Sequence, residues 1–238
     1  MPQGDIVGLL IMATVAGLAM PAGAILATYQ GIQPKWLEKE LRHGILALGA
    51  GALISAVGLV LVPEGIKDVS VLAAIMCFVG GALAFMALDI YLAKKKTAGS
   101  QLAAMLSDFV PESIALGSTA ALGGGTMLLG LLIAVQNLPE GFNAYREMLP
   151  KNKQRSNKLI VIFVLMALLG PVFSLLGFYY LVQFPVVMSG VMLFAAGGIL
   201  YSVFQDIAPQ IRMENHWLPP LGGILGFLVG LVGFMLEG

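Results

Sequence analysis

The sequence predicts an all-α membrane protein whose chain crosses the bilayer eight times. The 238 residues are 58% hydrophobic and only 11% charged, with a mean hydropathy of +0.91, which is too apolar for a soluble domain of this length. Eight apolar windows are each long enough to cross about 30 Å of hydrocarbon. The connections between them are short, so residues 1–238 are expected to form a single transmembrane domain.

The eight windows follow one another from the first residues to the last. The residues before the first window lack a basic segment, so we expect that window to be a true span and not a cleaved signal. The single cysteine, Cys77, excludes an internal disulfide, and two histidines are too few for a Cys/His metal cluster. The windows are 6–27, 44–62, 71–93, 101–121, 125–145, 158–181, 187–208 and 219–236.

The basic residues predict the orientation, because those next to membrane spans stay on the cytoplasmic side. If both termini lie outside, 12 of the 13 basic residues fall inside and only Lys67 falls outside. An odd number of spans would destroy this asymmetry. We therefore expect a multi-pass protein with both termini extracytoplasmic. The inside set is Lys35, Lys39, Arg42, Lys94, Lys95, Lys96, Arg146, Lys151, Lys153, Arg155, Lys158 and Arg212.

A short internal similarity predicts an inverted repeat. The stretches Gly51–Pro63 and Gly197–Pro209 have the same glycine-to-proline spacing of twelve, yet they would cross the bilayer in opposite directions. The windows 6–27 and 158–181 also share a central proline, at Pro21 and Pro171. We expect the first three and the last three windows to be inverted copies around the fourth and fifth. Transporters with this arrangement hold a midplane site between the repeats.

The fourth and fifth windows carry acidic residues at membrane depth. A carboxylate there costs roughly 2.5–3.5 kcal/mol on insertion scales, so it usually faces a partner, a cavity or an ion. Asp108 and Glu112 stand four residues apart, and Gln136 and Glu140 repeat this spacing, so each pair lies on one face of its helix. Acids in two neighbouring spans predict one shared site.

Each of the two glutamates follows a proline, Pro111 or Pro139. Proline donates no backbone hydrogen bond, and its ring pushes against the carbonyl four residues earlier, so we expect both helices to kink and to free oxygens beside the carboxylates. Ordinary proline kinks with polar packing are the alternative, but they leave the matched spacings unexplained. We therefore predict a metal site, whose ligands are Asp108, Glu112, Gln136 and Glu140.

The sequence Gln136-Asn137-Leu138-Pro139-Glu140-Gly141 resembles the H/Q-N/D-x-P-E-G signature of the ZIP (Zrt/Irt-like protein) metal transporters, and Asp108-Phe109-Val110-Pro111-Glu112 is similar to a diverged copy. The resemblance implies uptake of divalent Zn, Fe or Mn toward the cytoplasm by alternating access. It implies a binuclear site with Glu112 and Glu140 as bridging carboxylates. It also implies a homodimer in a bacterial inner membrane, with no tightly bound cofactor and no enzymatic activity.

Two positions depart from the family pattern. Phe109 stands where the second ion would expect Asn, and Gly170 stands where a Glu often precedes proline, although Asn137 is retained. We therefore expect one ion in place of two. Ligation by oxygen alone favours harder ions such as Mn²⁺ or Fe²⁺, and Zn²⁺ also binds carboxylates well.

Four further residues are expected around the site or along the ion pathway. Ser107 and Asn137 adjoin the proposed ligands in sequence. Glu64 lies at the outer end of its span, where it either gathers cations or is a solvated helix terminus. Asp206 approaches the cytoplasmic side and either lines an exit or is solvated there.

Other functions compete with transport. A membrane metal sensor, or a structural protein of the same fold, would bind without moving ions. An intramembrane aspartyl protease would use Asp89 and Asp108, which requires both acids at equal depth on facing helices. Asp89 lies close to Lys94–Lys96, with which we expect it to pair. Metal flux would separate a transporter from a sensor, and a protease would have to cleave peptide bonds.

Overall fold

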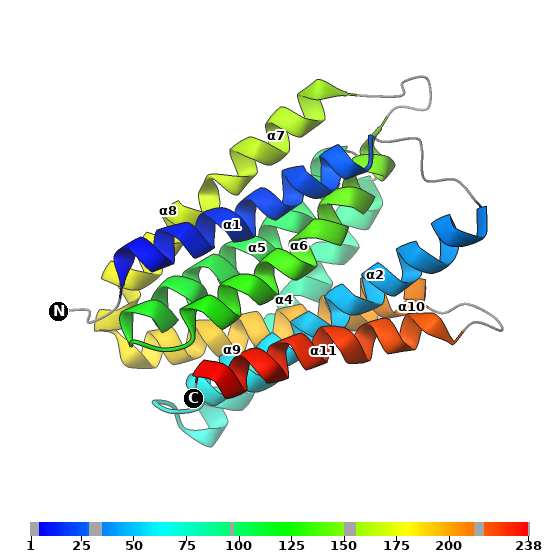
Figure 1. Ribbon diagram of the computed structural model, residues 1–238. Helices are drawn as coiled ribbons and strands as arrows, with labels where there is room; N and C mark the ends of the chain where they lie inside the picture. Colours follow the sequence, from blue (N-terminus) through cyan, green and yellow to red (C-terminus); the bar gives the residue numbers. More distant parts are fainter. Residues whose placement is uncertain (1–4, 29–34, 96–97, 150–155, 212–216, 238) are drawn as a thin grey trace.

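The computed structural model describes residues 5–28, 35–95, 98–149, 156–211 and 217–237, and these residues contain helices but no strand. Figure 1 shows the helices running alongside one another in one bundle. In chain order the segments are α1 (Ile6–Leu26), α2 (Lys35–Ala56), η1 (Val57–Leu61), α3 (Val62–Gly65), α4 (Val71–Lys95), α5 (Ala98–Ala121), α6 (Thr126–Met148), α7 (Asn157–Ala167), α8 (Leu169–Tyr179), η2 (Leu181–Gln183), α9 (Pro185–Ser202), η3 (Val203–Ile207), α10 (Ala208–Ile211) and α11 (Leu218–Glu237).

Several of these segments follow one another directly and form longer helical rods. The segments α2, η1 and α3 make one rod, α7 and α8 make another, and α9, η3 and α10 make a third. Together with α1, α4, α5, α6 and α11, the rods coincide with the eight apolar windows predicted from the sequence. The rod that contains α2 begins earlier than its window, because its first turns are too polar to be counted as membrane-spanning.

Six of the described helical segments are long and apolar enough to cross a membrane. The chain is therefore a multi-pass membrane protein. The helices α5 and α6 are not among the six, because both carry acidic and amide side chains. They lie inside the bundle, where α6 packs against α1 and α2 and α5 packs against α8 and α9. The six are Ile6–Leu26, His43–Gly65, Val71–Lys94, Asn157–Gln183, Pro185–Gln205 and Leu218–Leu236.

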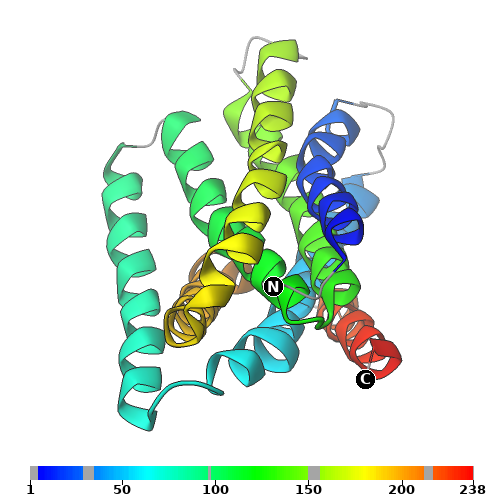
Figure 2. The same cartoon turned by 90° about the vertical axis from the view of Figure 1, so that its left-hand side faces the viewer.

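The most apolar helices are not all in the interior. Only 11% of the apolar stretch of α4 and 22% of that of α11 are buried, against 67% for His43–Gly65. Figure 2 shows α4 and α11 at opposite edges of the bundle. Their exposed apolar side chains suit contact with lipid.

The π-helical turns of the structure lie near prolines of helices other than α5 and α6. Both α5 and α6 continue through Pro111 and Pro139. The rods of α2 and α9 instead contain π-helical turns, η1 and η3, just before Pro63 and Pro209. Proline has no backbone N–H and so cannot donate a hydrogen bond to the preceding turn. A π turn includes one extra residue and thereby accommodates this missing backbone hydrogen bond.

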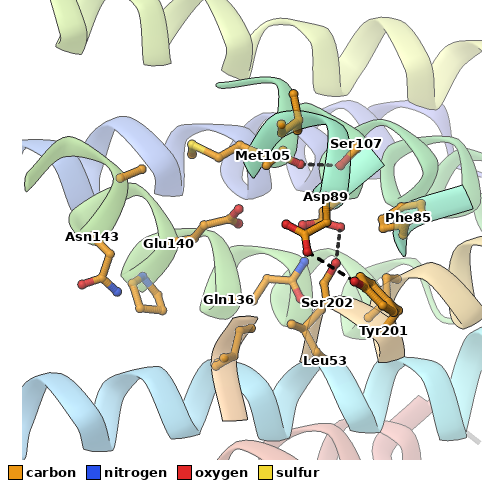
Figure 3. Close-up of a pocket in the computed structure, with 18 of the residues that line it drawn as sticks. Leu53, Phe85, Asp89, Met105, Ser107, Gln136, Glu140, Asn143, Tyr201 and Ser202 are labelled. Atoms are coloured by element: carbon orange, nitrogen blue, oxygen red, sulfur yellow. Dashed lines mark hydrogen bonds between the residues drawn. The ribbon is translucent and has the colours of Figure 1, made fainter. Parts of the chain in front are cut away.

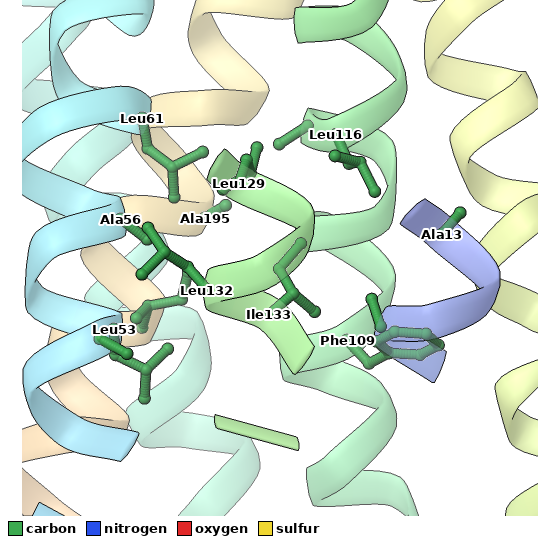
Figure 4. Close-up of a cluster of buried hydrophobic side chains, with 14 of the residues drawn as sticks. Ala13, Leu53, Ala56, Leu61, Phe109, Leu116, Leu129, Leu132, Ile133 and Ala195 are labelled. Carbon is green, nitrogen blue, oxygen red and sulfur yellow. The ribbon is translucent and has the colours of Figure 1, made fainter. Parts of the chain in front are cut away.

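The two ends of the bundle differ in packing. The turn between α5 and α6 marks one end, which we call the turn end, and Gly123 adopts a φ of +74° there. We call the other end, where α2 begins and α4 and α6 finish, the open end. Figure 4 shows buried apolar side chains from η1, α5, α6 and α9 filling the half toward the turn end: Leu61, Leu116, Leu129, Leu132 and Ala195.

Paired glycines bring four pairs of helices into close contact. In each pair, a glycine of either helix faces a backbone carbonyl of the other helix, so the backbones themselves touch. Small residues permit such approach in membrane bundles. The pairs are Gly23 with Gly141 for α1 and α6, Gly117 with Gly177 for α5 and α8, Gly51 with Gly226 for α2 and α11, and Gly81 with Gly197 for α4 and α9.

Two adjacent glycines of α4 allow this packing to be tested. A Cβ at Gly81 would overlap the backbone carbonyl of Phe194, whereas a Cβ at Gly80 would meet nothing within 4 Å. We expect Gly81→Ala to lower the free energy of unfolding by about 1–3 kcal/mol, the usual cost of overpacking. The control Gly80→Ala should leave it unchanged or raise it slightly. Thermal unfolding in detergent measures both, and equal midpoints would contradict the assigned contact.

Candidate metal centre

A cavity of about 400 Å³ occupies the half of the bundle toward the open end (Figure 3). Its walls come from the second halves of α2, α4 and α6, the first half of α5, and the end of the rod that contains α9 and η3. The polar side chains on these walls are Asp89, Ser107, Asp108, Gln136, Glu140, Asn143, Glu147, Tyr201 and Ser202.

The helix α6 supplies a polar stripe to this cavity. Gln136, Glu140, Asn143 and Glu147 recur at intervals of four, three and four residues, which places them on one helix face. Gln136 and Asn143 are buried, Glu140 is half-buried and Glu147 is exposed. The stripe therefore leads from the interior to the surface at the open end.

The first half of α5 supplies a carboxylate opposite this stripe. Asp108 is half-buried, and its Oδ1 accepts a hydrogen bond of 3.3 Å from the Ser202 hydroxyl of α9. Its neighbour Ser107 also lines the cavity, but the Ser107 hydroxyl donates to the carbonyl of Ala104 in its own helix, at 2.6 Å. Asp108 is thus connected across the cavity wall to α9.

A second carboxylate is connected to the same end of α9. The Tyr201 hydroxyl donates to Asp89 Oδ2 at 3.3 Å, and both side chains line the cavity (Figure 3). We had expected Asp89 to pair with the lysines that follow it. Of these, Lys94 is exposed, and the side chains of Lys95 and Lys96 lie outside the described residues.

Glu112 lies behind the cavity wall. Its side chain is only 3% exposed, and its Oε2 accepts a hydrogen bond of 2.5 Å from Gln136 Nε2. Of the four predicted ligands, Asp108, Gln136 and Glu140 therefore face the cavity, and Glu112 is reached only through Gln136. Among the described residues, no three His, Cys, Asp or Glu side chains stand close enough together to hold an ion. An ion bound by both Glu112 and Glu140 would require the Gln136 amide to move aside.

The residues predicted around the site are spread more widely. Asn137 is 1% exposed, and its amide donates to the carbonyl of Ala16 in α1 at 2.9 Å, so it joins two helices. Glu64 lies at the turn end, where it forms an ion pair of 2.5 Å with Lys67. The backbone of Asp206 belongs to η3, but its side chain lies outside the described residues.

Phe109 and Gly170 pack against each other. Phe109 is 1% exposed, and a Cβ built on Gly170 would lie 2.8 Å from the tip of its ring. The same Cβ would lie 3.0 Å from the carbonyl of Ala13 in α1. The aromatic ring therefore fills the space beside Gly170, and neither position offers an oxygen ligand.

The charge of the cavity favours cations. Its described lining includes the four carboxylates of Asp89, Asp108, Glu140 and Glu147 but no lysine or arginine. Charges in such a cleft interact more strongly than in water, because the surrounding apolar helices have a low dielectric constant. A divalent cation would relieve the repulsion among these carboxylates.

Five of the polar lining residues were not among those predicted for the metal site or the ion pathway. Asn143 and Glu147 continue the helical spacing that begins at Gln136 and Glu140, so an extended periodicity search would have found them. Asp89, Tyr201 and Ser202 have no such signal. They reach the cavity only because α4 and α9 pack beside α5.

The bundle and its cavity define a class: a multi-pass helical membrane protein with an acidic cavity. The chain matches no known family model, and a search of curated proteins found no relative.

Proposed function

We propose that this protein transports divalent transition-metal ions toward the cytoplasm, with Mn²⁺, Fe²⁺ and Zn²⁺ as the candidate substrates. One observation carries the proposal: a multi-pass membrane protein holds a cavity with four carboxylates and no basic side chain in its described lining. The resemblance of Gln136–Gly141 to the ZIP signature supports it, because Gln136 and Glu140 of that motif face this cavity. A homodimer is expected from the same resemblance.

The proposed transport cycle uses the difference between the two ends of the bundle. The cavity reaches the surface at the open end, and apolar packing closes the turn end. The basic residues Lys94 and Arg146 lie in the last turns of α4 and α6, at the open end, so the positive-inside rule makes that end cytoplasmic. This conformation is then inward-facing. Entry from outside requires the packed half to separate while the cavity closes.

Eight crossings are part of this proposal. The packing of α5 and α6 against apolar neighbouring helices supports it, since α5 and α6 are not among the six segments apolar enough to cross a membrane. With Cys77 replaced by serine, a cysteine introduced by Lys94→Cys should react with an impermeant reagent only from the cytoplasmic side. One introduced by Gly124→Cys should react only from outside. Labelling of both from the same side would contradict eight crossings.

The inverted repeat is also proposed, and three features support it. The contacts of α1 with α6 and of α2 with α11 correspond to those of α8 with α5 and of α9 with α4. Each of these four contacts has reciprocal glycines. The π turns also correspond: η1 begins six residues after Gly51 and η3 begins six residues after Gly197.

Uptake of a panel of divalent metals by proteoliposomes tests the function. Vesicles that contain the wild-type protein should accumulate at least one of Mn²⁺, Fe²⁺ and Zn²⁺ faster than protein-free vesicles. The variant Glu140→Gln, which keeps the size of the side chain but loses its charge, should not. Binding without flux would indicate a metal sensor in place of a transporter.

An aspartyl protease is a second candidate, since Asp89 and Asp108 line the same cavity. Each carboxylate accepts a hydrogen bond from a different α9 side chain. Cleavage of a transmembrane peptide that is abolished by either Asp89→Asn or Asp108→Asn would favour this function over transport.

A further inference from the structure

We infer that Ser202 supplies a further oxygen ligand beside Asp108, so that the cation site extends from α5 and α6 to the end of α9. The inference rests on the proposed metal binding. Ser202 Oγ lies 3.3 Å from Asp108 Oδ1, and both side chains line the cavity. Sequence motifs gave no reason to include α9 in the site. The short distance between these two oxygens does give one.

The separation of the two oxygens is close to that of two ligands on one ion. In an octahedral site with metal–oxygen distances near 2.1 Å, adjacent oxygens stand about 3.0 Å apart. The Asp108 and Ser202 oxygens need to approach by only a few tenths of an ångström to share an ion. They come from different helices, so one ion at this point would join α5 to α9.

The direction of the Ser202 hydroxyl supports this role. Serines in helices commonly donate to a carbonyl of the preceding turn. Ser55 and Ser107 do so, bonding to Ala52 and Ala104. The hydroxyl of Ser202 bonds instead to a carboxylate of another helix, inside the cavity. A neutral hydroxyl adds an oxygen ligand to this acidic cavity without adding charge.

The backbone around Ser202 also differs from that of an ordinary helix. Ser202 is the last residue of α9, immediately before the π-helical turn η3. Single π turns are frequent at functional sites, because the extra residue changes the directions of the side chains around it. The preceding residue, Tyr201, also reaches a cavity carboxylate. The end of α9 therefore directs two consecutive hydroxyls toward acids on α4 and α5.

A hydroxyl ligand bears on which metals the site prefers. Oxygen ligands suit harder ions such as Mn²⁺, whereas thiolates select softer ions such as Cd²⁺. Replacing the Ser202 hydroxyl with a thiol should therefore shift the preference from Mn²⁺ toward Cd²⁺. A residue that only packed between helices would produce no such shift.

The test uses the purified full-length protein with Mn²⁺ and Cd²⁺. We expect Ser202→Ala to weaken Mn²⁺ binding about tenfold, the loss typical of a supporting group at a metal site. Ser202→Thr keeps the hydroxyl and should bind Mn²⁺ within about twofold of wild type by the same reasoning. Ser202→Cys should favour Cd²⁺ and show thiolate-to-cadmium charge-transfer absorption. Wild type, which already carries Cys77, should show no such absorption.

Ser55→Ala is the matched control, because Ser55 stands two residues before η1 and bonds within its own helix. It should bind Mn²⁺ like wild type. Unchanged Mn²⁺ binding in Ser202→Ala, with no cadmium–thiolate absorption in Ser202→Cys, overturns the inference. Wild-type binding in the same experiment leaves the proposed metal binding intact. If the wild-type protein binds no divalent ion, both fall together.

Discussion

Replacing Glu140 with alanine should reduce divalent-metal affinity by roughly 100-fold or more, since loss of even a supporting group at a metal site costs 10–100-fold. Glu140 faces the cavity from the middle of the polar stripe of α6. Isothermal titration of the purified protein with Mn²⁺ measures the change.

Glu64→Ala is the matched control for this result. Glu64 is already paired with the exposed Lys67, at the turn end and away from the cavity. An entrance charge of this kind contributes only screened attraction, about 1 kcal/mol or less, so affinity should fall less than about fivefold. Equal losses in the two variants would show that the α6 stripe has no special role in binding.

The second large effect concerns stoichiometry: the protein should hold one divalent ion per chain, even in excess metal. Two dications a few ångströms apart repel strongly in a medium of low dielectric constant, so a second ion needs its own oxygen ligands. The Phe109 ring fills the space beside Gly170, and the amide of Asn137 is hydrogen-bonded to the carbonyl of Ala16 in α1. Phe109 and Gly170 therefore supply neither room nor a side-chain oxygen for a second ion, and the amide nitrogen of Asn137 is held by α1.

Metal analysis of the protein after removal of free ions measures this number, and two ions per chain would contradict it. The occupancy should also depend on pH. Carboxylate ligands must lose their protons to bind metal, so protons compete with the ion and affinity should rise with pH until the ligands are fully ionised. Titrations at several pH values measure that rise. An affinity that did not change with pH would exclude carboxylates as the main ligands.

The positions of the helices followed directly from the sequence, because hydropathy records burial in an apolar medium. All eight apolar windows correspond to helical rods. The π turns were not predicted, since a proline indicates that one backbone hydrogen bond of the helix is missing but does not specify how the helix adjusts to its loss. The helices α5 and α6 continue through Pro111 and Pro139, and the kinks expected there stay a prediction.

The candidate site could be predicted only where its residues are periodic along one helix. Spacing identified Gln136 and Glu140, and both face the cavity. Spacing also grouped Glu112 with Asp108, but Glu112 lies deeper, behind Gln136, because a shared helix face does not fix the depth of a side chain. Ser202 enters the site through tertiary packing, which local sequence does not encode.

One divalent ion should bind among the cavity residues of α5 and α6. Anomalous scattering from crystals soaked in excess Mn²⁺ tests it most directly, because the signal places the ion without assumptions about its ligands. We predict a single fully occupied peak within coordination distance of Asp108 and Glu140. Two full peaks between α5 and α6, or a peak only at Glu64 and the turn end, would contradict the account.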